Sequence, residues 1–408
     1  MPLSLARRLD VVQPSVTLAM NARAADLRGK GADVFAFGVG EPDFEPPALV
    51  IDAARKALDT GVSKYTAVTG IPALKQAICA RTAAVRGWTP RPSQVTVSIG
   101  AKHALFNLAV ALYEPGDEVV IPAPYWVSYP EQVKICGAEP VIVQTEEASG
   151  FKMTPDAFAK ALNPRTKAVI LCSPSNPTGS AYSEAELRAL IEVWRTKSDS
   201  YLIMDEIYAD LVYDGFKHVS AAAILESSAA GREAMDRLVI VDGVSKTYAM
   251  TGWRIGWSIA SERLAKALDT VQGQSTTNAT AIAQHAAVAA LNGPQEEVER
   301  MRSVFERRRS VMVEGLRSIP GVKCRMPEGA FYAFADCRSL YGIEYQGKPI
   351  ANDEDIAFFL LDEAHVAAVP GGAFGAPGYV RFSYATSEDR IRGGIASINR
   401  VVAAAKRA

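Results

Sequence analysis

Between residues 48 and 290, short apolar segments alternate with segments of helical character, and this alternation constrains the fold more than any other feature. Helical patterns such as 102–113 and 183–197 separate several of the apolar segments. Strands that alternate with helices form a largely parallel sheet with helices on both faces. The sequence therefore predicts an α/β fold with strands at 95–100, 118–124, 167–174, 201–206, 237–243 and 256–261.

The chain changes character at both ends of this region. Residues 1–30 suggest an arm and a helix, and a charged helical segment at 293–321 is long enough to connect two domains. The remainder mixes strands and helices and suggests a smaller α+β unit. We expect an N-terminal arm with part of a small domain at 1–47, and a large domain at 48–292. An interdomain helix and a C-terminal small domain are expected at 293–408.

Composition excludes several classes of protein. The 408 residues include 44 Lys and Arg against 45 Asp and Glu, a balance that argues against nucleic acid bound through bulk charge. The five cysteines form no C-x-x-C pair and the four histidines are isolated, so we expect neither a disulfide framework nor a metal site. No secretory signal or membrane-spanning apolar run is present, so a cytoplasmic protein is expected.

Polar residues follow several predicted strands at their carboxyl ends, where open parallel sheets bind ligands. Small residues precede Lys102 at the start of a helix, and a helix N-terminus favours an anion such as phosphate. The ends of the other strands contribute an amide, a carboxylate, a phenol, an amine and a guanidinium, from Asn176, Asp205, Tyr208, Lys246 and Arg254. This edge of the sheet is therefore the expected ligand site.

Each of these residues alone also has a purely structural interpretation. A strand-end Asp is more often a helix cap, a strand-end Lys is usually solvated, and the sequence around Asn176 is a good turn. Gly38 and Gly40 resemble a dinucleotide fingerprint, but no third glycine follows and no helix is predicted there. We give His103 a structural role.

Together, the strand-end residues match the chemistry of pyridoxal phosphate. Its aldehyde requires a lysine for a Schiff base, and its pyridine nitrogen requires a carboxylate. Its phosphate requires a helix N-terminus and an arginine. A lysine near the pyridinium and Arg254 should have a lowered pKa, which would make it a usable base near neutral pH.

The chain also resembles a known family along nearly its whole length. The matching motifs run in order from "QPSVTLAMNARA" through "GVGEPDF", "SKYTAVTGIPALKQAI", "APYWVSYP", "SPSNPTG" and "DEIY" to "SKTYAMTGWRIG" and "VRFSYATSED". These are similar to motifs of class I, fold type I pyridoxal-phosphate aminotransferases, specifically the aspartate aminotransferase subgroup Iβ. The resemblance implies a mostly parallel seven-stranded sheet in an α/β/α sandwich, a smaller α+β domain, and a homodimer with active sites at the subunit interface.

The resemblance also implies a set of cofactor-binding residues. Lys246 would bind the cofactor covalently and then move a proton between the substrate and the cofactor. Asp205 would pair with the pyridinium nitrogen, and Asn176 and Tyr208 would hydrogen-bond the phenolic oxygen. The ring would stack on Trp126. The remaining cofactor contacts are implied for the backbone of Ala101 and Lys102, for Ser245, for Arg254, and for Tyr65 of a second subunit.

For the substrate, the resemblance implies that Arg381 clamps the α-carboxylate, helped by Asn176, Trp126 and the backbone of Gly40. A distal carboxylate would be met by Lys102, Ser15 and Thr17. These residues predict an aminotransferase that moves the amino group of L-aspartate to 2-oxoglutarate.

Alternatives to the aspartate reaction stay open. One is an aromatic, alanine or prephenate aminotransferase, or a β-lyase, on the same scaffold; Gln13 stands where prephenate-active members carry a lysine. Another is a non-catalytic, cofactor-sensing module like those of some transcription regulators. Against that module, only about thirty residues precede the fold, and Lys246, Asp205 and Arg381 are all present.

Overall fold

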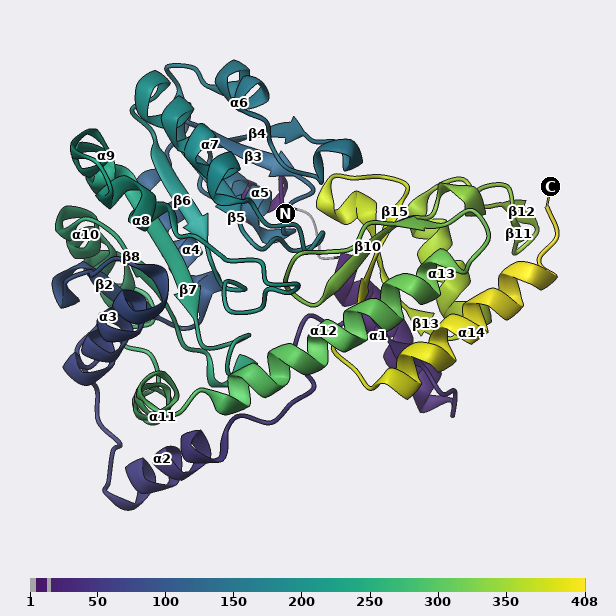
Figure 1. The fold of residues 1–408 in the computed structure, drawn as a ribbon, viewed down its shortest axis with the longest axis horizontal. Coiled ribbons are helices and arrows are strands. Elements are labelled where there is room, and N and C mark those ends of the chain that lie inside the picture. The colour runs from purple at the N-terminus through teal and green to yellow at the C-terminus, as the bar shows by residue number, and fades with distance from the viewer. Residues whose placement is uncertain (1–4, 13–15, 408) are drawn as a thin grey trace.

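The computed structural model describes residues 5–12 and 16–407, and its largest element is a seven-stranded sheet (Figure 1). Every neighbouring pair is parallel except the two that involve β8, which runs antiparallel to β2 and β7. The strand order is β2 (Val95–Ser98), β8 (Gly256–Ile259), β7 (Leu238–Gly243), β6 (Tyr201–Asp205), β5 (Thr166–Cys172), β3 (Glu118–Ala123) and β4 (Glu139–Gln144).

The predicted fold class is confirmed, and one strand of the large sheet was missed. All six strands predicted from apolar runs are present, with ends shifted by one or two residues. β4 was not predicted because it lies at the sheet edge, where its side chains are half-buried or exposed and its apolar run is short.

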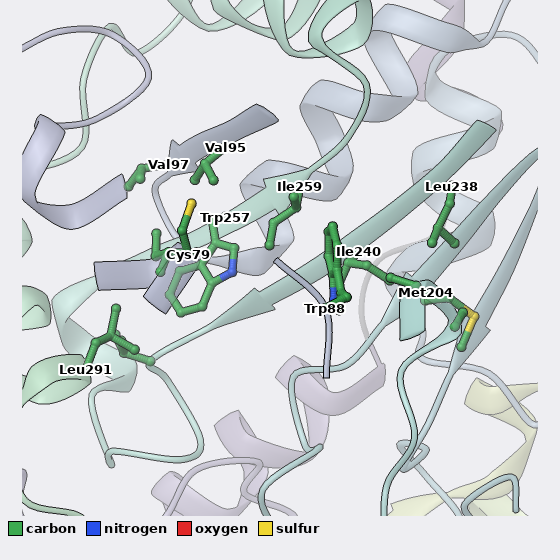
Figure 2. Packing of buried hydrophobic residues seen from close by; sticks show 14 of the residues in the cluster. Cys79, Trp88, Val95, Val97, Met204, Leu238, Ile240, Trp257, Ile259 and Leu291 are labelled. Atoms are coloured by element: carbon green, nitrogen blue, oxygen red, sulfur yellow. The ribbon is translucent and has the colours of Figure 1, made fainter. Parts of the chain in front are cut away.

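Helices cover both faces of the large sheet because successive strand residues point to opposite sides. In β7, Leu238 and Ile240 join a core cluster with Trp88 and Trp257 (Figure 2). Val239 joins a second cluster on the other face. The first cluster contains residues of α2 (Ala48–Asp59), α3 (Pro72–Arg86), α7 (Glu184–Lys197), α8 (Ala221–Glu226) and α11 (Ala281–Asn292). The second contains residues of α4 (Ala101–Leu112), α5 (Ser128–Ile135) and α10 (Glu262–Gly273).

A second core surrounds a smaller antiparallel sheet. Its strand order is β14 (Val369–Pro370), β15 (Tyr379–Ser383), β10 (Tyr332–Asp336) and β9 (Lys323–Cys324). Three helices contribute to this core: α12 (Glu296–Arg317), α13 (Asp353–Ala364) and α14 (Glu388–Ala404). The long helix α12 runs from the large sheet to the small one (Figure 1), which agrees with the connector predicted at 293–321.

The N-terminal segment packs with the C-terminal part of the chain. Helix α1 (Val16–Gly29) contributes Met20 and Ala24 to a small cluster with Ala357 and Leu361 of α13. The short strand β1 (Phe35–Ala36) pairs with β13 (Val366–Ala367) in parallel. This packing is compatible with the predicted domain boundaries, which stay a prediction.

The remaining described elements complete the chain. Among the described residues, no helix combines the length and the apolar character that crossing a membrane requires. The other α-helices and strands are α6 (Pro155–Ala161), α9 (Ala229–Ala234), β11 (Glu344–Tyr345) and β12 (Lys348–Pro349).

Candidate active site

A cavity of about 380 Å³ has residues of both sheets in its wall. One side, the strand-end wall, consists of Ala101, Asp205, Ser245 and Lys246, which follow or end strands of the large sheet. The other, the mid-strand wall, consists of Tyr332 and Arg381, which lie within β10 and β15. The cavity is also lined by Gly40, Lys102, Trp126, Val127, Tyr129, Cys172, Asn176, Ile207, Tyr208, Arg254 and Phe374.

Lys246 lies three residues beyond β7 and donates from Nζ to the Gly40 carbonyl at 2.7 Å. Burial lowers the pKa of Lys246 to about 8, with smaller lowering contributions from Arg254 and Arg381 and an opposing one from Glu41. The predicted direction is confirmed, although burial is the leading cause and Arg254 a minor one. An amine with this pKa is neutral in a substantial fraction of molecules near pH 7 to 8, so it can accept a proton.

Asp205 ends β6 and is buried. Its Oδ2 accepts a hydrogen bond from the Tyr129 hydroxyl at 2.7 Å, and its Oδ1 accepts from the Ile207 N–H at 3.2 Å. Burial raises the pKa of Asp205 to about 6 against these hydrogen bonds. No helix starts at Asp205, so it is not a helix cap. A carboxylate held this way is suited to a cationic partner such as a pyridinium.

The start of α4 and Arg254 together form an anion site. The N–H groups of Ala101 and Lys102 lie in the first turn, where a helix has no internal acceptors. Arg254 donates to the Thr251 carbonyl at 2.8 Å and to the Ile99 carbonyl at 3.4 Å, and no carboxylate of the described residues pairs with it. A Cβ at Gly100, whose φ is +81°, would come within 2.7 Å of the Arg254 guanidinium. Glycine there lets the guanidinium reach the helix N-terminus, an arrangement that fits a phosphate.

Arg381 is a buried cation paired only with neutral oxygens among the described residues. It is 4% exposed, and it donates to Asn176 Oδ1 and to the Gly38 carbonyl, each at 2.8 Å. Its guanidinium carbon lies 4.4 Å from the Tyr332 ring centre and 5.0 Å from that of Phe374. Burying a guanidinium is costly unless a negative group joins it, so the site fits a carboxylate ligand.

Tyr208 and Tyr332 join the two walls through their hydroxyl groups, which lie 2.9 Å apart. Both phenols are buried, and burial raises the pKa of each. A Cβ at Gly40 would lie 3.0 Å from the Tyr332 hydroxyl, so this loop approaches the cavity as closely as glycine allows. Because burial raises the pKa of both phenols, they stay protonated and can donate hydrogen bonds.

Lys102 and Trp126 lie together at the cavity. The Lys102 ammonium is 4.9 Å from the centre of the Trp126 ring, and burial, with Arg254, lowers the pKa of Lys102. Of the residues expected to act with Lys102, Ser15 lies outside the described residues, and Thr17 lies in α1 with its side chain outside the description. Tyr65 is 89% exposed and does not line the cavity of its own chain.

Sequence reasoning missed several cavity residues. Tyr129, Tyr332 and Phe374 line the cavity, and the first two hydrogen-bond predicted residues. Tyr129 lies within the quoted "APYWVSYP" segment, which offered a signal. Tyr332 lies within the apolar stretch that forms β10, so nothing distinguished it from a core tyrosine.

The structure agrees with the expectations for His103 and for the Gly38 and Gly40 pair. His103 Nδ1 accepts a hydrogen bond from the Ile99 N–H at 3.3 Å, which stabilises the turn before α4. No helix follows Gly40 until α2 begins at Ala48, so the glycine pair is not a dinucleotide fingerprint. The carbonyls of Gly38 and Gly40 instead accept hydrogen bonds from Arg381 and Lys246.

Comparison with known proteins identifies the family. A sequence model of the protein family "Aminotransferase class I and II" matches residues 32–398 of this chain. An "Aspartate aminotransferase" of Geobacillus stearothermophilus is 45% identical over 98% of this chain and all of the relative. An "Aspartate/prephenate aminotransferase" of Cereibacter sphaeroides is 45% identical over 95% of this chain and 96% of the relative.

Solved structures agree with the sequence comparisons. An aspartate aminotransferase from Rhizobium meliloti superposes with a TM-score of 0.94 at 42% identity and covers 99% of this chain and 100% of its own. An aspartate aminotransferase from Thermus thermophilus with maleate gives 0.89 at 40% identity and covers 98% and 99%. The chain therefore belongs to the class I and II aminotransferases, which depend on pyridoxal phosphate.

Proposed function

We propose that this chain is an aspartate aminotransferase that transfers the amino group of L-aspartate to 2-oxoglutarate, giving oxaloacetate and L-glutamate. One observation carries the substrate assignment: the cavity contains Arg381, a buried guanidinium without a carboxylate partner among the described residues, and a second cation, Lys102. A dicarboxylate supplies one negative group for each. The names of the relatives support the same substrate.

The strand-end wall and neighbouring residues of the cavity serve the cofactor. Bound pyridoxal phosphate withdraws electrons from the substrate's α-carbon, which makes the proton on that carbon removable. Asp205 stabilises a positive charge on the ring nitrogen, and Tyr129 and the Ile207 N–H hold that carboxylate in place. Ser245, Arg254 and the first turn of α4 bind the phosphate, and Asn176, Tyr208 and Trp126 hold the ring.

The Nζ atom of Lys246 has two roles in this proposal. It holds the cofactor's aldehyde covalently in the absence of substrate, and as a free amine it takes the proton from the α-carbon. The lowered pKa of about 8 suits the second task because the neutral amine is available near neutral pH.

Arg381 orients the substrate. Its planar fork matches a carboxylate bidentately, and the Tyr332 and Phe374 rings against it exclude water. Binding the α-carboxylate there directs the α-carbon toward the strand-end wall. Lys102 binds the distal carboxylate, with Ser15 and Thr17 as its proposed helpers.

A homodimer completes the proposal. Tyr65 is exposed in the single chain, as expected for a side chain that serves the cavity of a second copy. Sedimentation of the active protein tests this assembly, because an active monomer would rule out a site built from two chains.

The half-reaction with single amino acids tests the function. The visible cofactor band of the purified protein is followed after addition of aspartate, glutamate, phenylalanine or alanine. The proposal requires aspartate and glutamate to bleach the band much faster than the other two. A band bleached only by neutral amino acids would overturn the substrate assignment, and a protein that shows no band after added cofactor would overturn the enzyme proposal.

A further inference from the structure

A cluster of six charged or titratable residues lies beside the strand-end wall without lining the cavity. It is called the Arg86 cluster here and consists of Arg81, Arg86, Glu206, Asp210, His218 and Asp242. Its members are joined by ion pairs of 2.8 to 3.7 Å.

Arg86 is the centre of this cluster. It is the last residue of α3, and its side chain is 9% exposed. The guanidinium lies 2.8 Å from Asp210 and 3.7 Å from each of Glu206 and Asp242. A single buried cation therefore faces three carboxylates.

These carboxylates belong to the two segments that carry the proposed catalytic groups. Glu206 directly follows Asp205, and Asp242 lies in β7, four residues before Lys246. Asp210 also accepts a hydrogen bond from the Thr247 hydroxyl at 3.2 Å, next to Lys246. Arg86 thus links the chain around Asp205 to the chain around Lys246 from outside the cavity.

The cluster has an uneven charge. Three carboxylates face two guanidinium groups, since Arg81 also lies 3.7 Å from Asp210. Balance requires one proton, and Asp242 is suited to hold it because burial raises its pKa well above its ordinary value. The Tyr248 phenol, which lies beside Arg86, Asp210 and Asp242, donates to Gln295 Oε1.

The charge of the cluster reaches the active site. Glu206 is one of the groups that raise the pKa of Asp205, after burial as the leading cause. A charge one residue away from Asp205 acts through protein interior, where it is screened less than in water. The cluster can therefore influence both the position and the ionisation of the groups in the cavity.

We propose that Arg86 is a positioning residue, which holds Asp205 and Lys246 in their places and compensates the negative charge of Glu206 and Asp210 beside them. This inference rests on the proposed roles of Asp205 and Lys246. A buried ion-pair cluster that only stabilises the fold is the competing explanation.

The test compares three variants with wild type. Arg86→Met removes the cation, and Arg86→Lys keeps the charge but loses the fork. The double variant Arg86→Met with Asp210→Asn removes one charge of each sign, because Asp210 is the carboxylate 2.8 Å from Arg86 and its pKa is lowered. Arg55→Met is the matched control, because Arg55 is an exposed helix arginine paired with the exposed Asp52.

The readouts are the pH midpoint of the visible band of the bound cofactor, the cofactor dissociation constant and the unfolding midpoint. Arg86→Met should move the band midpoint to higher pH by at least about 0.5 unit, because the loss of a cation favours the protonated nitrogen of Lys246. It should also weaken cofactor binding about tenfold or more. Arg86→Lys and the double variant should return the midpoint most of the way to wild type, and Arg55→Met should change nothing.

A measurement on the cofactor-free protein separates this inference from the proposed function. The rate of reductive methylation of Lys246, followed by peptide mass against pH, should shift in the same direction in Arg86→Met. Folded Arg86→Met with an unchanged band midpoint and an unchanged methylation profile would overturn the inference, even if its unfolding midpoint falls. If Arg86→Met does not fold, the double variant and Arg86→Lys are measured in its place. Cofactor binding by the double variant that is as tight as in wild type would overturn the positioning role of the Arg86 guanidinium.

Discussion

The two walls of the cavity differ in how the chain builds them. In the strand-end wall, Asp205 ends the apolar strand β6 and Lys246 follows the apolar strand β7, so both lie where the chain leaves the sheet. In the mid-strand wall, Arg381 is the third residue of a five-residue strand, and its neighbours Val380 and Phe382 are core residues. The first wall places polar groups where side chains are free of the sheet, whereas the second buries a cation within it.

This difference separates the two tasks of the site. Groups at strand ends converge on one edge, which suits a cofactor held by many contacts. A guanidinium between Tyr332, Phe374 and Asn176 is fixed in direction, which suits orientation of one carboxylate. Changes in the strand-end wall should therefore affect the chemistry, and changes in the mid-strand wall should affect substrate binding.

The largest effect is expected for Lys246→Ala. This variant should lose turnover by about 10⁴-fold or more, since the Lys246 amine both holds the aldehyde and moves the proton. Steady-state rates and the visible spectrum measure it, and Lys266→Ala, at an exposed lysine of α10, is the control. Near-normal turnover in Lys246→Ala would contradict the central role of the strand-end wall.

Arg381→Lys should lower kcat/KM by about 10²- to 10³-fold, because lysine keeps the charge but not the bidentate fork. The loss should be similar for aspartate and phenylalanine, since both present the same α-carboxylate. A loss of kcat/KM confined to aspartate would show that Arg381 binds the distal carboxylate instead of the α-carboxylate.

The pH dependence of unfolding tests the strand-end wall without cofactor. Because the pKa of Asp205 is raised from 3.8 to about 6, the folded protein binds more protons than the unfolded chain in this interval. The stability that Asp205 contributes is present below pH 3.8 and is lost as pH rises through about 6, an effect on the order of 3 kcal/mol. In urea titrations of the cofactor-free protein, Asp205→Asn should lack this component; an identical pH profile would show that Asp205 titrates normally.

Lys102→Met should lower kcat/KM for dicarboxylic substrates more than for neutral ones. Aspartate should lose about 10- to 100-fold in kcat/KM, the usual worth of a hydrogen bond to a charged group, while phenylalanine should change by no more than about threefold. Equal losses for both amino acids would mean that Lys102 serves the cofactor and not the distal carboxylate.

The smallest effect is expected for Tyr332→Phe. It removes the hydroxyl that contacts Tyr208 but keeps the ring beside Arg381. The loss of one hydrogen bond should cost about fivefold in kcat/KM. Tyr208→Phe is measured in parallel. A larger loss of kcat/KM in Tyr208→Phe than in Tyr332→Phe would show that the Tyr208 hydroxyl, on the cofactor side of the cavity, is the more important of the two.

Sequence patterns predicted one wall better than the other. Six strand positions followed from apolar runs, and the polar residues at their ends followed from them. Arg381 was recognised only through family resemblance, because nothing local distinguishes an arginine within a buried strand from a packing residue. Tyr129 and Tyr332 were missed because their partners, Asp205 and Tyr208, are 76 and 124 residues away in sequence.

The sequence by itself determined the parallel sheet and hence the meeting of Asp205 and Lys246, because the carboxyl ends of parallel strands share one edge. Only the tertiary structure decided what faces that edge. The approach of β10 and β15, the pairing of Tyr208 with Tyr332 and the placement of Arg86 all join distant segments. The lowered pKa of Lys246 and the raised pKa of Asp205 depend on the same packing, since burial is their leading cause.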